Sequence, residues 1–365
     1  MSEAMRKAAW LNGPDRNVTR FGERAKFREG LYRLSPKTYA WMVPNGSWGE
    51  TNFGLIDCGG KSIVIDTGWD LRCAHEFLDG AADLLARSPV DSVINTHADG
   101  DHCWGNQLFG NVPIIATHAC IGHMHHVEPK TMQLLARAAR VMKILPVAGI
   151  DVLGHYVSAM VAPYDFTGIH IVAPNQGFSG ERTITLNGID VVLMEMGPAH
   201  TPGDAMIFVP CEKVLYAGDI VFTSSTPVVW AGPVANITGA LRKVLSLDAD
   251  VIVAGHGPLA TRADVELQLA YWELIQEELD RRRRQGRRAD AAAADLLLSA
   301  KFQATPFAAW DSPERLLRNA QALYEEWGER PARLPEKLAR LDTLRRQGLL
   351  ALRLPEATPQ VMHRR

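Results

Sequence analysis

The feature that most constrains this chain is a dense group of metal-binding side-chain types between residues 97 and 102. Four of these six residues are histidine or aspartate: His97, Asp99, Asp101 and His102. They follow the apolar run 93–95, which is typical of the end of a buried strand. Imidazole nitrogen and carboxylate oxygen are ligands that a borderline cation such as zinc accepts, and a tight turn can direct several of them to one point. The segment therefore predicts a metal site where a strand passes into a helix.

Three later segments each place one further metal-capable side chain at the end of an apolar run. These side chains are His200, Asp219 and His256. Glycines stand close to all three, and glycine lets the backbone turn sharply and approach a ligand closely. A single histidine or aspartate at a strand end is usually a core residue or a helix cap. Four such segments in one chain favour a metal centre over that explanation.

The pattern resembles the metallo-β-lactamase superfamily over roughly residues 32–258. It includes Asp66-Thr67-Gly68 after an apolar run, which matches the strand-Asp-Thr-Gly element of that family. The resemblance implies that Asp66 orients metal ligands. It also implies a ligand set of two groups with one bridging residue: His97, Asp99 and His200 for the first metal, Asp101, His102 and His256 for the second, and Asp219 between them.

Asp99 departs from the family pattern H-x-H-x-D-H, because it stands where the middle histidine is expected. A carboxylate also binds zinc, manganese or iron, so the first site either survives with an altered metal preference or is weak or empty. The cofactor expected here is zinc, one or two ions per chain, with manganese or iron as alternatives.

The fold implied is α/β, a four-layer αββα sandwich with its metals at one edge between two sheets. We expect residues 1–260 to form the catalytic domain, with a helical insertion at about 120–180. Residues 261–365 are expected to form an α-helical extension that packs on this domain or on a partner subunit of a homodimer. Hairpins are predicted across Asn187-Gly188 and across 210–213, and 39–43 is predicted to pair with 52–56.

Helical periodicity indicates helices at 72–87, 130–145, 151–161, 263–285, 314–327 and 335–350. In the insertion, 130–145 is expected to bury one apolar face (Leu134, Leu135, Ala138, Val141, Met142 and Leu145), and Asp151 is expected to cap the next helix. Sulfur-containing and aromatic side chains of this segment are predicted to cover a substrate pocket as a group: Met124, Met132, Met142, Tyr156, Met160, Tyr164 and Phe166.

Composition limits the classes of partner. The net charge of −2 gives no bulk electrostatic argument for nucleic acid or an anionic membrane, and no apolar run reaches the ~18–20 residues of a membrane span. The basic run 281–284 is therefore interpreted as a solvated helix face. Five scattered cysteines and a polar start at 1–17 without a signal-peptide core indicate a reducing, cytoplasmic location.

Two further features border the predicted site. Trp230, in a loop that follows Asp219, is expected to line the substrate pocket or else to be a core residue. The histidines at 118, 123, 125 and 126 are interpreted as polar surface or supporting residues rather than as an accessory metal site. Segments 99–106 and 226–233 also look like a bacterial branch that includes polyketide cyclases and hydrolytic dehalogenases.

The predicted function is that of a metallo-hydrolase. Metal-bound hydroxide would attack a small hydrophobic or aromatic substrate at an ester, thioester, lactone or aryl-halide bond, while Asp101 or Asp99 holds or moves the proton. An alternative is a cyclase in which the same metals promote an intramolecular aldol condensation. A third is a metal-binding protein without catalysis.

Overall fold

The computed structural model describes residues 3–329, 335–354 and 362, and it contains two β-sheets. The strands of the larger sheet follow one another in chain order: β1 (Ala9–Asn12), β2 (Gly30–Arg33), β3 (Thr38–Met42), β4 (Phe53–Asp57), β5 (Ser62–Ile65), β6 (Val90–Ile94), β7 (Ile114–Thr117) and β8 (Gln176–Phe178). Pairing is antiparallel from β1 to β5 and parallel from β5 to β8.

The smaller sheet has the order β13-β12-β11-β10-β9. Its strands are β9 (Glu181–Leu186), β10 (Ile189–Glu195), β11 (Ala205–Val209), β12 (Val214–Phe222) and β13 (Val251–His256). All pairs are antiparallel except the parallel pair of β12 and β13. The predicted hairpins across Asn187-Gly188 and 210–213 are confirmed, and Asn187 has the positive φ that its tight turn requires.

The two sheets pack face to face through branched aliphatic side chains. Ile63 and Ile65 of β5 lie in one buried cluster with Val191 and Leu193 of β10. Their spacing of two residues places both members of each pair on the inner face of its sheet. This periodicity explains why the apolar runs of the sequence form strands with a shared core.

Helices cover the outer faces of both sheets. On the larger sheet lie α2 (Leu71–Gly80) and α3 (Ala82–Arg87), with Phe77 packed in the cluster that contains Trp41 of β3. On the smaller sheet lie α8 (Val234–Ser246) and α9 (Arg262–Arg284), which share a core with β12. The predicted αββα sandwich is therefore confirmed. The single helix predicted at 72–87 is divided at Ala81, and Asp70 caps its start by accepting a hydrogen bond from the Cys73 amide.

The insertion forms α6 (Pro129–Met142) and α7 (Ile150–Val161) beyond the short helices α4 (Gly100–Cys103) and α5 (His118–His123). The apolar face predicted for this region is wrong in part, because Leu134 and Val141 are 65% and 57% exposed and Leu145 is also exposed. The helix instead buries Met132 and Ala139, because apolar residues occur around more of its circumference than its neighbours cover. Asp151 does not occupy the N-cap: Gly149 does, with φ +83°, a conformation that glycine adopts readily.

The remaining described elements are mostly short or belong to the C-terminal part of the chain. They are α1 (Glu3–Lys7), α10 (Ala289–Leu297), α11 (Ala300–Gln303), α12 (Leu316–Glu326), α13 (Glu336–Ala351) and the short 3-10 turns η1 (Asn106–Phe109), η2 (Pro210–Glu212), η3 (Pro306–Ala309) and η4 (Pro313–Arg315). The sequence patterns did not predict α10 and α11, whose buried residues lie in the core beside α9 and α12. The proposed division into domains at residue 260 stays a prediction.

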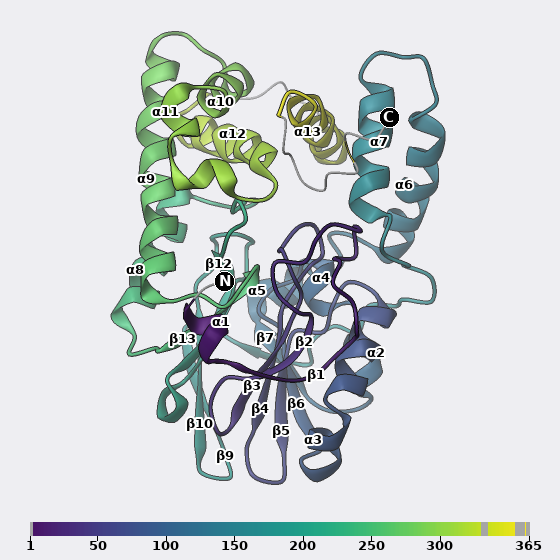
Figure 1. Cartoon of the computed structure of the whole chain (residues 1–365), viewed down its shortest axis with the longest axis vertical. Helices are drawn as coiled ribbons and strands as arrows, with labels where there is room; N and C mark the ends of the chain where they lie inside the picture. Colours follow the sequence, from purple (N-terminus) through teal and green to yellow (C-terminus); the bar gives the residue numbers. More distant parts are fainter. Residues whose placement is uncertain (1–2, 330–334, 355–361, 363–365) are drawn as a thin grey trace.

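Three groups of helices stand beyond the same end of the sheets. In Figure 1, α6 and α7 rise on one side, α9 to α12 rise on the other, and α13 lies between them. The basic run at the end of α9 is paired within its own helix, since Arg281 and Arg282 bind Glu278 while Arg283 and Arg284 bind Asp280. None of the helices in the described ranges is long and apolar enough to cross a membrane.

Candidate metal centre

The predicted ligand residues all meet at one edge of the sandwich. His97 and Asp99 follow β6, and α4 carries Asp101 and His102. The remaining three come from the smaller sheet: His200 from the loop between β10 and β11, Asp219 from β12, and His256 from the end of β13. Segments separated by more than 100 residues are thus joined because their strands end at the same edge.

Asp219 occupies the centre of the group. Its Oδ1 atom lies 3.2 Å from Nε2 of His102, and its Oδ2 atom lies 3.3 Å from Nε2 of His200 and 3.4 Å from Nε2 of His256. The Nε2 atom of His97 is 4.0 Å from the same Oδ2. One carboxylate therefore faces four imidazoles, as a residue that bridges two cations must.

The other ligand candidates divide into two groups around Asp219. In the first, the Oδ2 atom of Asp99 lies 3.9 Å from Nε2 of His97 and 3.3 Å from Nε2 of His200. In the second, Oδ2 of Asp101 lies 3.8 Å and 3.4 Å from the Nε2 atoms of His102 and His256. Tetrahedral zinc with bonds of about 2.0–2.1 Å separates its ligand atoms by about 3.4 Å. The closer pair in each group, at 3.3 Å and 3.4 Å, has this spacing, and the other pair is wider, at 3.9 Å and 3.8 Å.

Each histidine directs Nε2 into the centre because its other ring nitrogen is engaged. Nδ1 of His200 donates to the Val228 carbonyl at 2.7 Å, and Nδ1 of His256 donates to the Glu50 carbonyl at 3.1 Å. A carbonyl only accepts, so Nδ1 carries a proton in both rings, and in the neutral form of each ring Nε2 presents a lone pair. This tautomer is the one that binds a metal through Nε2.

Asp66 and Thr96 fix the remaining two rings. Asp66 Oδ2 lies 2.8 Å from Nδ1 of His102 and accepts the Thr96 hydroxyl at 2.7 Å. Since the only hydroxyl hydrogen of Thr96 points at Asp66, its oxygen accepts from Nδ1 of His97 at 3.0 Å. Asp66 itself has φ +61°, which is uncommon for a residue with a side chain and is typical of a functional position. Sequence reasoning found Asp66 but missed Thr96, although it directly precedes His97.

Two other supports were also missed. Thr51 donates to Oδ2 of Asp101 at 2.7 Å and so holds that carboxylate. Gly255 leaves room for Asp219, because a Cβ at this position would lie 1.9 Å from Oδ1 of Asp219. The position of Gly255 directly before His256 could have indicated its role in the sequence. Nothing near Thr51 in the sequence indicated that it holds Asp101.

The pKa values of the ligand candidates are shifted in different directions by burial and by neighbouring charges. Burial lowers the pKa of His97 to about 3, with His102 adding to this effect. Burial also opposes protonation of His200, but Asp219 and Asp99 outweigh it and raise the pKa of His200 to about 9. Burial raises the pKa of Asp99, yet the hydrogen bond with His200 and nearby positive charges, including Arg340, hold it below its usual range.

The residues present fit one or two divalent cations. The Nε2 atoms of His97 and His102 and Oδ1 of Asp219 are buried without a hydrogen-bond partner among the described residues. Unpaired buried polar atoms are rare and call for an explanation such as a bound ion. Four imidazole nitrogens and three carboxylates are the donors that zinc, manganese and iron accept.

A cavity of about 420 Å³ opens onto this centre. Its walls include Trp48, Trp69, Met132 and Met160, and Trp230 lines it as expected. Of the seven insertion residues predicted to cover a substrate, only Met132 and Met160 line this cavity. Tyr156 instead donates to the buried carboxylate of Glu314, and Tyr164 and Phe166 pack against Trp69.

The histidine cluster of the insertion does not join the metal centre. His123, His125 and His126 line the cavity, and the rings of His123 and His126 are stacked at 4.2 Å. His118 does not line the cavity, and its ring covers Gly177 of β8 instead. Among the described residues, the clusters able to hold a metal include none of these four, and their role stays a prediction.

Comparisons with known proteins agree with this geometry. One curated relative is the 2,4-dinitroanisole O-demethylase subunit alpha of Nocardioides sp. (strain JS1661), 25% identical over 217 residues, which are 58% of this chain and 54% of the relative. Another is the acyl-coenzyme A thioesterase MBLAC2 of Bos taurus, 24% identical over 204 residues, 54% of this chain and 65% of the relative. The chain therefore spans less than two thirds of either relative.

Solved structures share the fold at low sequence identity. The sec-alkylsulfatase Pisa1 from Pseudomonas sp. has a TM-score of 0.65 and 17% identity, covering 89% of this chain and 58% of that one. A metallo-beta-lactamase family protein from Thermus thermophilus has a TM-score of 0.55 and 19% identity, covering 81% and 95%. The model of the metallo-beta-lactamase superfamily matches residues 46–256, which include every ligand candidate. The chain belongs to the metallo-beta-lactamase superfamily.

Proposed function

We propose that this chain is a metal-dependent hydrolase that acts on a small substrate with a hydrophobic or aromatic part. The observation that carries the proposal is that four imidazoles and three carboxylates converge, and that five of these seven side chains line a cavity whose walls are largely apolar. Such a cavity buries an apolar group beside a reactive centre and excludes bulk water from it. Ester, thioester, lactone and aryl-halide bonds are the candidate targets.

A divalent ion bound here would polarise the electrophile and lower the pKa of a coordinated water toward about 7. The chain's own residues would orient this chemistry. Asp219 faces all four imidazoles and holds both halves of the centre together. Zinc, one or two ions per chain, is the metal we propose, with manganese or iron as alternatives because Asp99 adds an oxygen donor.

Asp99 and Asp101 are the proton carriers that we assign. The Asp99 side chain is 26% exposed and lines the cavity, so it reaches both a bound water and a leaving group. Asp101 is more enclosed and its Oδ2 is held by Thr51, which suits it to fixing the orientation of a water molecule. We therefore expect Asp99 to contribute more to proton transfer than Asp101.

The names of the two curated relatives suggest bonds to test. One is named a thioesterase for acyl-coenzyme A, and the other a subunit of an O-demethylase for a dinitroaryl ether. Activated aryl ethers are therefore added to the candidate substrates, which already include thioesters. The homodimer and the cytoplasmic location stay predictions.

The test is turnover by the chain reconstituted with zinc, manganese or iron. Short-chain p-nitrophenyl esters, acyl thioesters, lactones, aryl halides and dinitroaryl ethers would be assayed in water enriched in oxygen-18. We expect metal-dependent turnover with incorporation of the label, and its loss in Asp219→Asn. A substrate with two ketone groups, offered separately, would test the cyclase alternative, and no turnover on any of the hydrolysable classes would contradict the proposal.

A further inference from the structure

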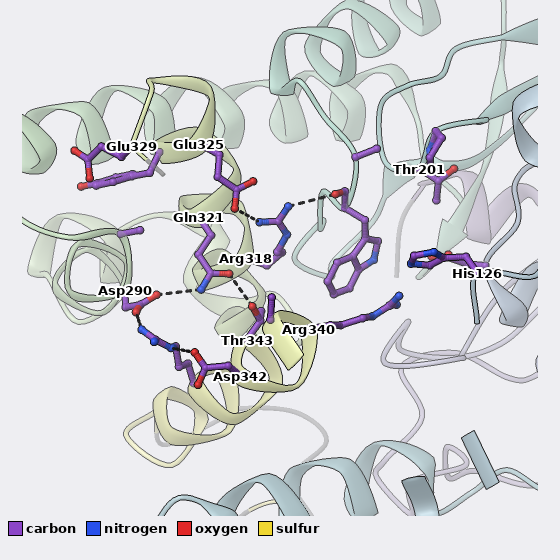
Figure 2. A pocket seen from close by; sticks show the side chains of 18 of the residues that line it. His126, Thr201, Asp290, Arg318, Gln321, Glu325, Glu329, Arg340, Asp342 and Thr343 are labelled. Carbon is purple, nitrogen blue, oxygen red and sulfur yellow. Dashed lines mark hydrogen bonds and ion pairs between the residues drawn. The ribbon is translucent and has the colours of Figure 1, made fainter. Parts of the chain in front are cut away.

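Two cavities meet beside the metal centre. The first is the apolar cavity of about 420 Å³, and the second is a larger one of about 940 Å³ lined by residues of α10, α12 and α13. Five residues line both cavities and form the border between them: Asp99, His123, His126, Trp230 and Arg340. Figure 2 shows the larger cavity, with Arg340 directed toward the side where His126 and Thr201 lie.

Arg340 lies at this border on the same cavity wall as Asp99, and its charge helps to lower the pKa of that carboxyl. Its guanidinium carbon lies 4.8 Å from the centre of the Trp230 ring, which fixes its plane. Within the described part of the chain it forms no ion pair, whereas Arg318 binds Glu325 at 3.4 Å and Arg346 binds both Asp290 and Asp342. Arg340 therefore keeps its bidentate donor edge available to a ligand.

A second arginine lies deeper in the apolar cavity. Arg315 is only 2% exposed, and its guanidinium carbon lies 4.6 Å from the centre of the Trp48 ring. Its Nη1 atom donates to Ser225 and Thr226 at 3.2 Å, but its Nε atom has no hydrogen-bond partner among the described residues. The adjacent buried carboxyl of Glu314 interacts with this charge, and the Nε donor remains unused.

The lining of the apolar cavity carries more positive than negative charge outside the metal ligands. Arg315, Lys337 and Arg340 are its cations, while Glu128 is its other carboxylate and is engaged by His125 at 2.7 Å. Apolar walls together with surplus arginine suit a ligand that is apolar at one end and anionic at the other.

We propose that Arg340, stacked on Trp230, binds an anionic group of an amphiphilic substrate and holds it beside the metal centre. The anion is a carboxylate, sulfonate, sulfate or phosphate, and the apolar part of the substrate occupies the cavity of Trp48 and Met160. This inference rests on the proposed function and deepens it by naming the substrate class.

The test measures binding rather than turnover. Decanesulfonate, decanoate and decanol would be titrated by calorimetry into the zinc-loaded protein, each below its aggregation concentration. The three probes share a chain and differ in the head group. We expect both anions to bind about tenfold more tightly than decanol, a difference of about 1.4 kcal/mol. In Arg340→Gln the dissociation constant of the anions should rise about tenfold while that of decanol stays within about twofold.

Arg345→Gln is the matched control, since Arg345 lies on the same helix and binds Asp342 instead of lining either cavity. It should leave all three affinities unchanged, and Arg340→Lys should restore part of the anion preference. An equal loss for anions and decanol in Arg340→Gln, the same loss in Arg345→Gln, or no loss at all would overturn the proposal. A sulfonate effect without a carboxylate effect would narrow the ligand to tetrahedral anions and support it. Failure here would leave metal-dependent turnover intact, so it is distinguishable from failure of the proposed hydrolysis.

Discussion

Asp66 and His102 form the contact that aims a ligand at the centre of the site. Oδ2 of Asp66 lies 2.8 Å from Nδ1 of His102, and the opposite nitrogen of that ring then lies 3.2 Å from Asp219. The carboxylate fixes the ring orientation and tautomer, and it increases the basicity of the metal-facing nitrogen.

Asp66→Asn should therefore weaken metal binding without removing a ligand. Substitutions of residues that orient a ligand in this way typically reduce metal affinity by about 10–100-fold. Competition with a chelating dye would measure the change for zinc. Asp190→Asn, which alters an exposed carboxylate on β10, is the control and should have no effect. Unchanged zinc affinity in Asp66→Asn would contradict the role given to this contact.

Gly255→Ala should displace Asp219, because the added Cβ would lie 1.9 Å from Oδ1 of that carboxylate. We expect the variant to fold but to bind less metal, measured by elemental analysis beside circular dichroism. Gly239→Ala on α8 is its counterpart, since a Cβ there meets nothing within 4 Å. That control should retain its metal, and its free energy of unfolding should increase by up to about 1 kcal/mol because alanine has a higher helix propensity than glycine. Full metal content in Gly255→Ala would count against the packing described for Asp219.

Metal binding should release protons near neutral pH. The pKa of His200 is raised to about 9 in the metal-free chain, so its ring is protonated at pH 7 and must lose that proton to bind a cation. Zinc affinity should accordingly rise as the pH increases from about 6 to about 9. Calorimetry in buffers of different ionisation enthalpy would count the protons, and a value of zero at pH 7 would be inconsistent with this network.

Glu278 should stabilise the helical extension through its three cations. Burial raises its pKa, but hydrogen bonds from Arg281, Lys301 and Arg282 outweigh burial and lower the pKa to about 2. A carboxylate with a depressed folded-state pKa stabilises the fold above its unfolded value near about 4.3, and this stability is lost as the pH falls toward about 2.

Glu278→Gln should therefore reduce the free energy of unfolding by roughly 2 kcal/mol at pH 7. Urea denaturation would show the difference from the unmodified chain shrinking between about pH 4 and about pH 2. Glu277→Gln serves as the neighbouring control, because this side chain is largely exposed and its nearest cation is 4.0 Å away. Equal losses of unfolding free energy in Glu278→Gln and Glu277→Gln would contradict the stabilising role assigned to Glu278.

The convergence of the candidate ligands was predictable because each of them belongs to a local pattern. His97, Asp219 and His256 each follow an apolar run that becomes a strand, and strands of this fold end at a common edge. The family resemblance then joined segments that the sequence keeps apart. Local signals also sufficed for the Asn187-Gly188 hairpin, where turn geometry depends on two adjacent residues.

The features of the structure that the sequence did not predict depend on packing between distant segments. Arg315 and Arg340 lie more than 50 residues beyond the last ligand, and only the folding of η4 and α13 over the site brings them to its cavity. The exposed face of α6 escaped for the same reason, since periodicity identifies apolar positions but not which of them a neighbour covers.

Seven converging side chains are proposed to hold the metal. The measurement that tests this most directly is the metal content per chain after zinc reconstitution. We expect one or two ions in the unmodified chain, the second depending on Asp99, and two ions in Asp99→His. We expect less than one ion in Asp219→Ala, which loses the carboxylate shared by all four imidazoles. A chain that binds no zinc, or an Asp219→Ala variant that keeps its full content, would contradict this proposal.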